Sequence, residues 1–193
     1  GINLGQGICD LPTPPQVLEA ASGAVLADES VYSSFEGVAA LRAQIAAKAR
    51  DFNGLPEVDA DRHVVTTIGA TGALACTLQA LLDPGDEVVV FEPYYGYHVN
   101  TARVSGCPVR FVTLAPPDWA LTEEALEEAL GKDTRAILFS NPTNPSGKVY
   151  SREELELLAR VCQRHDLLAI TDEIYERIVY DGASHISLAT LPG

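Results

Sequence analysis

Hydrophobic residues follow two patterns along this chain: short continuous apolar runs, and longer stretches with an apolar residue every three or four positions. The short runs are rich in β-branched residues, which indicates strands buried on both faces of a sheet. Five strands are predicted, at residues 64–68, 88–91, 109–112, 136–139 and 167–171. The longer periodicity indicates helices, predicted at residues 14–28, 38–52, 72–82, 97–104, 122–131 and 151–164.

Turn and capping signals mark the boundaries of these elements. Asn53-Gly54 suits a left-handed helix end, and Thr122 precedes two glutamates that favour a helix N-terminus. The segment 151–154, Ser-Arg-Glu-Glu, fits a capping box. Strands and helices alternate with short connections, so we expect an α/β fold with a mainly parallel sheet between two helical layers, a three-layer α/β/α arrangement.

Composition limits the possible partners. The 193 residues are 47% hydrophobic and 21% charged, which is typical of a globular protein, and the net charge is −14. This acidity argues against a nucleic-acid or anionic-membrane partner. The four widely spaced cysteines and the lack of a bilayer-spanning apolar run or signal peptide favour a cytoplasmic protein without a metal site. The chain has no methionine, even at position 1, so we expect it to be a piece of a longer polypeptide.

Four unusual segments each follow a predicted strand, at residues 69–73, 92–95, 141–148 and 172–175. In open α/β sheets, ligands bind beyond the carboxyl ends of the strands. We therefore expect these segments to share one site. The first, Gly69 to Ala73, combines flexible backbone, a hydroxyl and a helix start that could hold a phosphate, although a plain tight turn would also explain its glycines. It lacks the G-x-G-x-x-G pattern of dinucleotide sites.

The other segments supply groups suited to a pyridine-ring cofactor. Asp172 follows an apolar strand, where a cationic ring nitrogen would offset the cost of a buried carboxylate. A helix N-cap is the alternative. Tyr175 could turn its phenol to the same ligand, or pack at the edge of the core. Asn144 lies in an Asn-Pro-Thr-Asn-Pro segment that could be simply a stiff connection. Tyr95 could cover a planar ring or pack in the core.

These motifs, in this order, resemble the pyridoxal-phosphate (PLP)-dependent aminotransferases of class I/II, fold type I. The resemblance covers nearly the whole chain. It implies that Gly69, Ala70 and Thr71 bind the cofactor phosphate and that Tyr95 stacks on its ring. It also implies that Asn144 and Tyr175 bind the O3′ oxygen, and that Asp172 binds the ring nitrogen. Asp172 and Tyr175 are the catalytic candidates.

The resemblance extends to the N-terminal residues and to the organisation of the chain. The segment 3–7, Asn-Leu-Gly-Gln-Gly, resembles a substrate-side segment, in which Gly5 contacts the substrate. Tyr32 resembles the tyrosine that reaches the cofactor phosphate of a partner subunit, which implies a homodimer. Residues 1–30 are expected to link to the small domain, and residues 31–193 to form part of the large cofactor domain.

The implied reaction moves an amino group between an amino acid and a 2-oxo acid. Residues 118–121, 151–157 and 180–188 resemble the kynurenine aminotransferases and glutamine transaminase K, which implies an aromatic, sulfur-containing or glutamine substrate. A PLP-dependent C–S β-lyase and a non-catalytic binding domain of a regulator are the alternatives. The chain's three lysines, Lys48, Lys132 and Lys148, match no family motif, so the cofactor-linking lysine is expected beyond Gly193.

Overall fold

The computed structural model describes residues 1–3, 5, 7, 9–29 and 31–192. Contacts divide the chain into two compact units, residues 1–35 and residues 36–193. The division that we predicted lies between residues 30 and 31. The assignment of the two parts to a linking segment and a cofactor domain stays a prediction.

The first unit contains one helix, α1 (Pro15–Leu26). Pro14 is its N-cap and Pro15 its first residue, which suits proline because the first backbone N–H groups of a helix have no intrahelical partner. No residue of α1 is buried, and its apolar side chains Val25 and Leu26 are largely exposed. Within the described part of the first unit, no other helix or strand is present.

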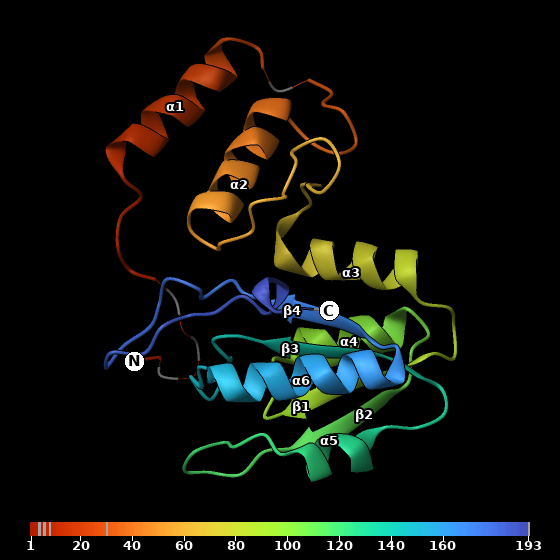
Figure 1. Ribbon diagram of the computed structural model, residues 1–193. Helices are drawn as coiled ribbons and strands as arrows, with labels where there is room; N and C mark the ends of the chain where they lie inside the picture. Colours follow the sequence, from red (N-terminus) through yellow and green to blue (C-terminus); the bar gives the residue numbers. More distant parts are fainter. Residues whose placement is uncertain (4, 6, 8, 30, 193) are drawn as a thin grey trace. The chain divides into compact units, whose positions relative to one another are not determined.

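The second unit is built on a parallel sheet (Figure 1). Its strands lie in the order β2-β1-β3-β4, with every neighbouring pair parallel. Val88 on β1 aligns with Val109 on β2 and Ala136 on β3. The prediction of a mainly parallel sheet is confirmed. The strand bounds are β1 (Glu87–Glu92), β2 (Val109–Thr113), β3 (Thr134–Ser140) and β4 (Leu168–Asp172).

Helices α3 (Gly69–Leu81), α4 (Gly96–Val104), α5 (Glu123–Ala129) and α6 (Arg152–His165) cover the two faces of this sheet. The second unit also contains α2 (Ala39–Asp51) and a short 3₁₀ helix at Leu188–Thr190. Buried residues of α3 and α4 form a cluster with one face, and buried residues of α5 and α6 form a cluster with the other. The expected three-layer arrangement is therefore present.

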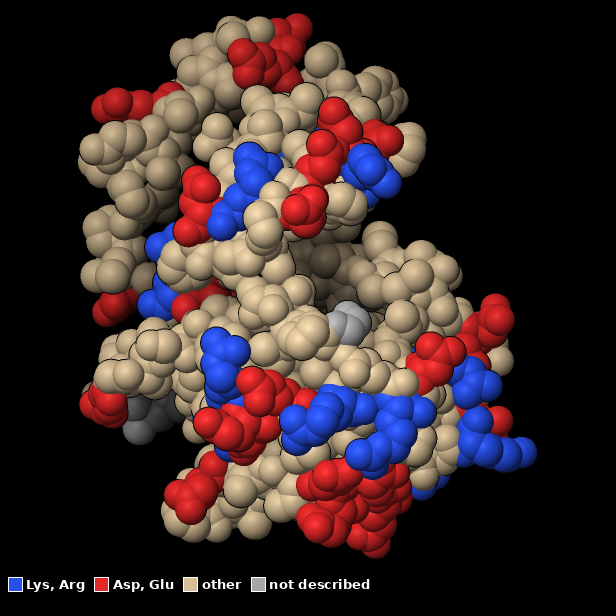
Figure 2. All heavy atoms as spheres, viewed as in Figure 1, with Lys and Arg blue, Asp and Glu red and all other residues tan. Residues whose placement is uncertain are grey.

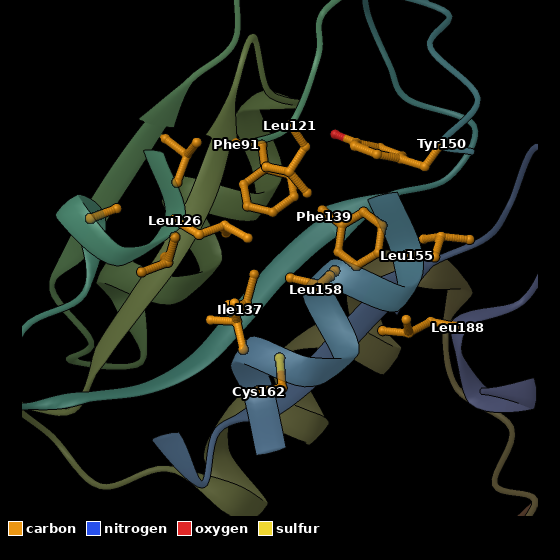
Figure 3. Close-up of a cluster of buried hydrophobic side chains, with 14 of the residues drawn as sticks. Phe91, Leu121, Leu126, Ile137, Phe139, Tyr150, Leu155, Leu158, Cys162 and Leu188 are labelled. Carbon is orange, nitrogen blue, oxygen red and sulfur yellow. The ribbon is translucent and has the colours of Figure 1, made fainter. Parts of the chain in front are cut away.

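Side chains on β1 alternate between the two layers, as the pleat of a strand requires. Val88 and Val90 pack with α3 and α4, whereas Val89 and Phe91 pack with α5 and α6. Figure 3 shows the second cluster, in which Phe91 and Phe139 lie with their ring centroids 5.5 Å apart. Because the central strands are buried on both faces, their sequences read as continuous apolar runs.

Two predicted helix starts are confirmed in detail. Ser151 Oγ accepts a hydrogen bond from the Glu154 backbone N–H, and the Glu154 side chain accepts one from the Ser151 N–H, which completes the capping box of α6. Thr122 caps α5 in the same way, by accepting from the Ala125 N–H. These bonds satisfy donors that a helix N-terminus otherwise leaves unpaired.

The predicted strand at Val64–Ile68 is wrong. None of the described strands pairs with this segment, and its side chains at Val65 and Ile68 are mostly exposed. Its backbone contacts a loop instead, where the Thr66 N–H donates to the Glu36 carbonyl at 2.9 Å. A strand needs a neighbouring backbone to pair with, and β-branched composition does not provide one. The run at residues 167–171 is accordingly the fourth strand and not the fifth.

Charged side chains gather over α5 and α6 (Figure 2). Glu123 and Glu127 on α5 both pair with Arg164 on α6, at 2.8 and 2.7 Å. Such exposed pairs contribute little to stability. None of the helices in the described residues is long and apolar enough to cross a membrane.

Candidate functional site

A cavity of about 190 Å³ lies in the second unit, beyond the carboxyl ends of β3 and β4. All the cofactor-binding candidates of the second unit line it: Gly69, Ala70, Thr71, Tyr95, Asn144, Asp172 and Tyr175. They come from α3, the residue before α4, the loop after β3, the end of β4 and the turn that follows it. The parallel sheet thus brings to one place segments that are far apart in the sequence.

The N-terminus of α3 forms one wall of this cavity. The helix begins at Gly69, so the residues expected in a turn before the helix are its first turn instead. Gly69 has a φ of +67°, a left-handed conformation that glycine adopts without steric cost. Ile68 is the N-cap and makes no side-chain capping bond. The first amides of α3, including those of Ala70 and Thr71, therefore have no intrahelical acceptor and suit an anion.

Asp172 is the last residue of β4, and its carboxylate is held at two points. Oδ2 lies 3.0 Å from Nε2 of His98, and Oδ1 accepts the Ile174 backbone N–H at 3.2 Å. The hydrogen bond from His98 holds the pKa of Asp172 below its ordinary value; burial opposes this shift, and the Ile174 N–H supports it. The carboxylate is therefore anionic at neutral pH and has its position fixed.

Sequence reasoning missed His98, which is 3% exposed. It lies in the first turn of α4, three residues after Tyr95, and that spacing could have placed the two side chains on one face. The Tyr95 ring meets the His98 ring edge-on, with centroids 5.7 Å apart and an angle of 86°. Both residues line a second cavity of about 170 Å³, which also includes Ala70, Thr71 and Asp172.

The two asparagines of the loop after β3 differ in their surroundings. Asn144 Nδ2 donates to the Tyr175 hydroxyl at 3.4 Å, so this pair of candidates meets at the cavity. Asn141 is 1% exposed, donates to the Ile186 carbonyl and accepts from the Tyr150 N–H. Asn141 therefore holds the loop together, and Asn144 is the amide available to a ligand.

The three lysines, and the glutamates at the end of β1 and after β4, are engaged in pairs. Lys148 contacts Glu154 at 2.7 Å, and Thr113 donates to Glu92 at 2.9 Å. Glu173 lies 3.2 Å from His185. Lys48 pairs with Glu176 and Lys132 with Asp133. None of the described residues that line the two cavities is a lysine.

The two remaining candidates lie in the first unit. The Gly5 N–H donates to the Asn3 side chain at 2.9 Å, and the side chain of Tyr32 is fully exposed. Leu4 and Gln6, within the predicted substrate-side segment, lie outside the described residues. The contact of Gly5 with substrate and of Tyr32 with a partner subunit stay predictions.

Comparison with known proteins agrees with this geometry. The family model of aminotransferase class I and II matches residues 1–192, and the chain belongs to this family. It is 41% identical over 206 residues to human (Homo sapiens) kynurenine–oxoglutarate transaminase 1, covering 100% of this chain and 48% of that protein. It is 38% identical to a probable N-succinyldiaminopimelate aminotransferase of Mycobacterium tuberculosis, with 100% and 49% covered. The chain spans about half the length of these curated relatives.

Solved structures give the same result for the fold. The N-succinyldiaminopimelate aminotransferase structure from Mycobacterium tuberculosis superposes with a TM-score of 0.94 at 38% identity, covering 98% of this chain and 50% of that one. An aromatic aminotransferase from Pyrococcus horikoshii OT3 gives a TM-score of 0.94 at 32% identity, with 98% and 51% covered. The fold is therefore that of about half of an aminotransferase subunit, as expected from the sequence.

Proposed function

We propose that the cavity beyond β3 and β4 binds pyridoxal 5′-phosphate, and that the protein transfers an amino group between an amino acid and a 2-oxo acid. The observation that carries this proposal is the convergence on a single cavity of seven residues that the resemblance assigns to the phosphate, the ring face, the O3′ oxygen or the ring nitrogen of the cofactor. Membership of the aminotransferase family supports the reaction type.

The groups around the cavity fit this cofactor in charge and kind. The first amides of α3, at Ala70 and Thr71, would hold the phosphate, while the Gly69 N–H donates to the Thr67 carbonyl at 2.9 Å and Gly69 forms the turn that presents them. Asp172 offers a fixed carboxylate for a protonated ring nitrogen. The Asn144 amide and the Tyr175 hydroxyl, already within hydrogen-bond distance of each other, would bind the phenolic oxygen. When bound, the cofactor supplies a ring that withdraws electrons from the substrate's reacting carbon.

The residues of this chain then have distinct tasks. His98 keeps Asp172 ionised and oriented, and Asp172 keeps the ring nitrogen protonated. Tyr95 covers one face of the ring and excludes water from it. Tyr175 and Asn144 fix the orientation of the ring in its plane. Electrostatic groups placed in advance where charge develops are the main means by which enzymes lower a reaction barrier.

The finer assignments rest on resemblance. We propose an aromatic, sulfur-containing or glutamine amino donor, supported by the likeness to a kynurenine–oxoglutarate transaminase and an aromatic aminotransferase. We also propose a cytoplasmic homodimer in which Gly5 contacts the substrate and Tyr32 reaches the cofactor phosphate of the partner subunit. The four cysteines, Cys9, Cys76, Cys107 and Cys162, are free, which suits a reducing compartment.

Cofactor binding is testable with the chain itself. Pyridoxamine 5′-phosphate needs no bond to a lysine, so equilibrium dialysis with it should show saturable binding that pyridoxine, which has no phosphate, does not match. Asp172→Asn should weaken this binding, whereas Asp133→Asn, an exposed acid remote from the cavity, should not. If the chain is folded and pyridoxamine 5′-phosphate does not bind, or if both variants behave alike, the proposed site is wrong.

The reaction is testable in a polypeptide of the relatives' full length that contains this chain. Incubation with PLP, a 2-oxo acid and kynurenine, phenylalanine, methionine or glutamine should give the new amino acid and the new oxo acid in equal amounts. With a cysteine S-conjugate as the substrate, pyruvate, ammonia and a thiol in equal amounts, with no new amino acid, would identify the C–S β-lyase instead.

A further inference from the structure

Three side chains with metal-binding groups converge after the end of β4. They are Glu173, Glu176 and His185, and one ligand atom of each lies within 4.8 Å of the others. Glu173 and Glu176 belong to the turn that follows β4, and His185 to the loop before the 3₁₀ helix. We propose that these three residues bind a divalent transition-metal ion of the zinc type.

Two buried atoms at this position have no hydrogen-bond partner among the described residues: Glu173 Oε1 and His185 Nδ1. The His185 side chain is only 5% exposed, and its Nε2 lies 3.2 Å from Glu173 Oε2. If Nε2 carries the proton and donates to Glu173, the lone pair of Nδ1 is left unsatisfied. If Nδ1 carries it, its N–H has no acceptor and the Nε2 lone pair faces a carboxylate. No protonation state satisfies this pair by itself, and burying an unpaired polar atom is costly.

A metal ion bound by His185 Nε2 and Glu173 Oε2 would remove one part of this conflict, because it would lie between the imidazole lone pair and the carboxylate that face each other. Imidazole nitrogen and carboxylate oxygen are both zinc ligands, at about 2.0–2.2 Å, and zinc usually has four ligands. Two ligands of one such ion lie roughly 3–3.5 Å apart, given those bond lengths. The 3.2 Å between His185 Nε2 and Glu173 Oε2 is within that range. Solvent would supply the remaining ligand.

A cation already occupies part of this position. Lys48 Nζ, from α2, lies 2.5 Å from Glu176 Oε1 and 2.6 Å from Oε2, and Asn53 donates to Oε2 at 2.8 Å. The ammonium group therefore neutralises Glu176 in this structure. A metal ion would have to compete with it, so Lys48 sets the affinity of the site.

The site does not border the 190 Å³ cavity proposed for the cofactor. Glu173 borders the 170 Å³ cavity beside Asp172, whereas Glu176 and His185 line a separate cavity of about 550 Å³. Two arginines share this space but are engaged elsewhere. The Arg177 guanidinium lies 3.8 Å from the centre of the Phe52 ring, and Arg152 pairs with Glu156 at 3.9 Å.

The test is metal binding by the full chain, measured without cofactor. The protein is treated with iodoacetamide, because Cys9 and Cys76 are exposed and thiols bind zinc, and is then freed of metal with EDTA. Titration with ZnCl₂ by calorimetry should show one ion bound per chain. His185→Gln and Glu176→Gln should each weaken binding by at least about 10-fold, the scale seen when even an outer-shell partner is lost. The matched control is His165→Gln, which removes an exposed histidine 3.0 Å from Glu127.

The Lys48→Met variant distinguishes a metal site from a cluster of side chains that only stabilises the fold. Removing the competing ammonium should tighten zinc binding by roughly 10-fold, the value of one hydrogen bond to a charged group. Circular dichroism of each variant shows whether it is folded. The proposal is overturned if the folded wild-type chain takes up no zinc. A buried water, and not a metal ion, would then satisfy the unpaired atoms of Glu173 and His185. It is also overturned if His185→Gln and His165→Gln bind zinc equally, or if Lys48→Met binds it no more tightly than the wild type.

Discussion

Two consecutive residues of the chain, Asp172 and Glu173, each place a carboxylate beside a buried histidine. The pair of Asp172 with His98 is separated by 3.0 Å, and the pair of Glu173 with His185 by 3.2 Å. Both histidine side chains are nearly inaccessible, at 4% and 5%, and the two carboxylates are similarly shielded, at 20% and 17%. By distance and burial the two pairs are almost the same.

They differ in what the remaining polar atoms contact. The second oxygen of Asp172 accepts the Ile174 N–H, and the residue borders both cavities that contain the cofactor candidates. The second oxygen of Glu173 and the second nitrogen of His185 have no hydrogen-bond partner in the described structure. A satisfied pair provides a fixed anion for a ligand, whereas an unsatisfied pair requires a further group, which is why we assign the two to different ligands.

The largest expected effect comes from removing the satisfied carboxylate. In a polypeptide of the relatives' length that contains this chain, Asp172→Ala should lower amino-transfer turnover by about 10²-fold or more, the typical loss for one electrostatic group. Cofactor content should fall far less, because the α3 contacts to the phosphate persist. Turnover and bound PLP are measured together. Turnover close to that of the Asp133→Ala control would remove Asp172 from its proposed role.

A smaller loss is expected from removing the histidine that holds this carboxylate. His98→Gln removes the imidazole that holds the Asp172 carboxylate, and should lower turnover by about 10-fold, since a hydrogen bond to a charged group contributes about 1.5–3 kcal/mol. His98 acts as a positioning residue. The matched control is His165→Gln, whose carboxylate partner, Glu127, is exposed. Equal turnover in the two variants would show that Asp172 does not depend on His98.

The same pair predicts a pH dependence with a definite sign. The hydrogen bond from His98 lowers the pKa of Asp172 below its ordinary 3.8. A carboxyl group with a depressed folded-state pKa stabilises the fold above its unfolded-state pKa, and this contribution is lost as the pH falls through the folded-state value. Carbon-13 NMR of the Asp172 carboxyl should give a midpoint below 3.8, and His98→Gln should raise it. A midpoint that does not move in the variant would show that His98 is not the cause of the lowered pKa.

Local signals in the sequence were sufficient for four of the five predicted strands and for the edge of the sheet at which the candidate site lies. The capping box at Ser151 involves residues three positions apart, and the buried strands carry their own apolar runs, so both could be recognised without tertiary information. The order of strand and loop then placed Asn144, Asp172 and Tyr175 at one edge. The roles of these residues remain predictions.

The contacts that escaped prediction are between residues far apart in the chain. His98 meets Asp172 across 74 residues, and no local pattern marks that pairing. Likewise His185 reaches Glu173 only because the loop before the 3₁₀ helix returns to the end of β4. The false strand at Val64–Ile68 has the same origin, since strand formation depends on a partner segment that the local composition does not specify.

The smallest expected effect on turnover comes from Tyr175, which lies in the turn that follows Asp172 and Glu173. Its hydroxyl accepts from Asn144 at 3.4 Å, near the upper limit for a hydrogen bond, so the bond itself contributes little to stability. Tyr175→Phe should therefore leave the free energy of unfolding within about 1 kcal/mol of the wild type, and lower turnover by about 3- to 10-fold through one lost contact.

Combination with His98→Gln sharpens this prediction. His98 is proposed to act on the ring nitrogen through Asp172, and Tyr175 to contact the phenolic oxygen directly. Groups that act independently give additive free-energy changes. The double variant should therefore lose turnover by the product of the two single losses. A double variant no slower than His98→Gln alone would show that Tyr175 acts through the Asp172 pair and does not contact the ligand independently.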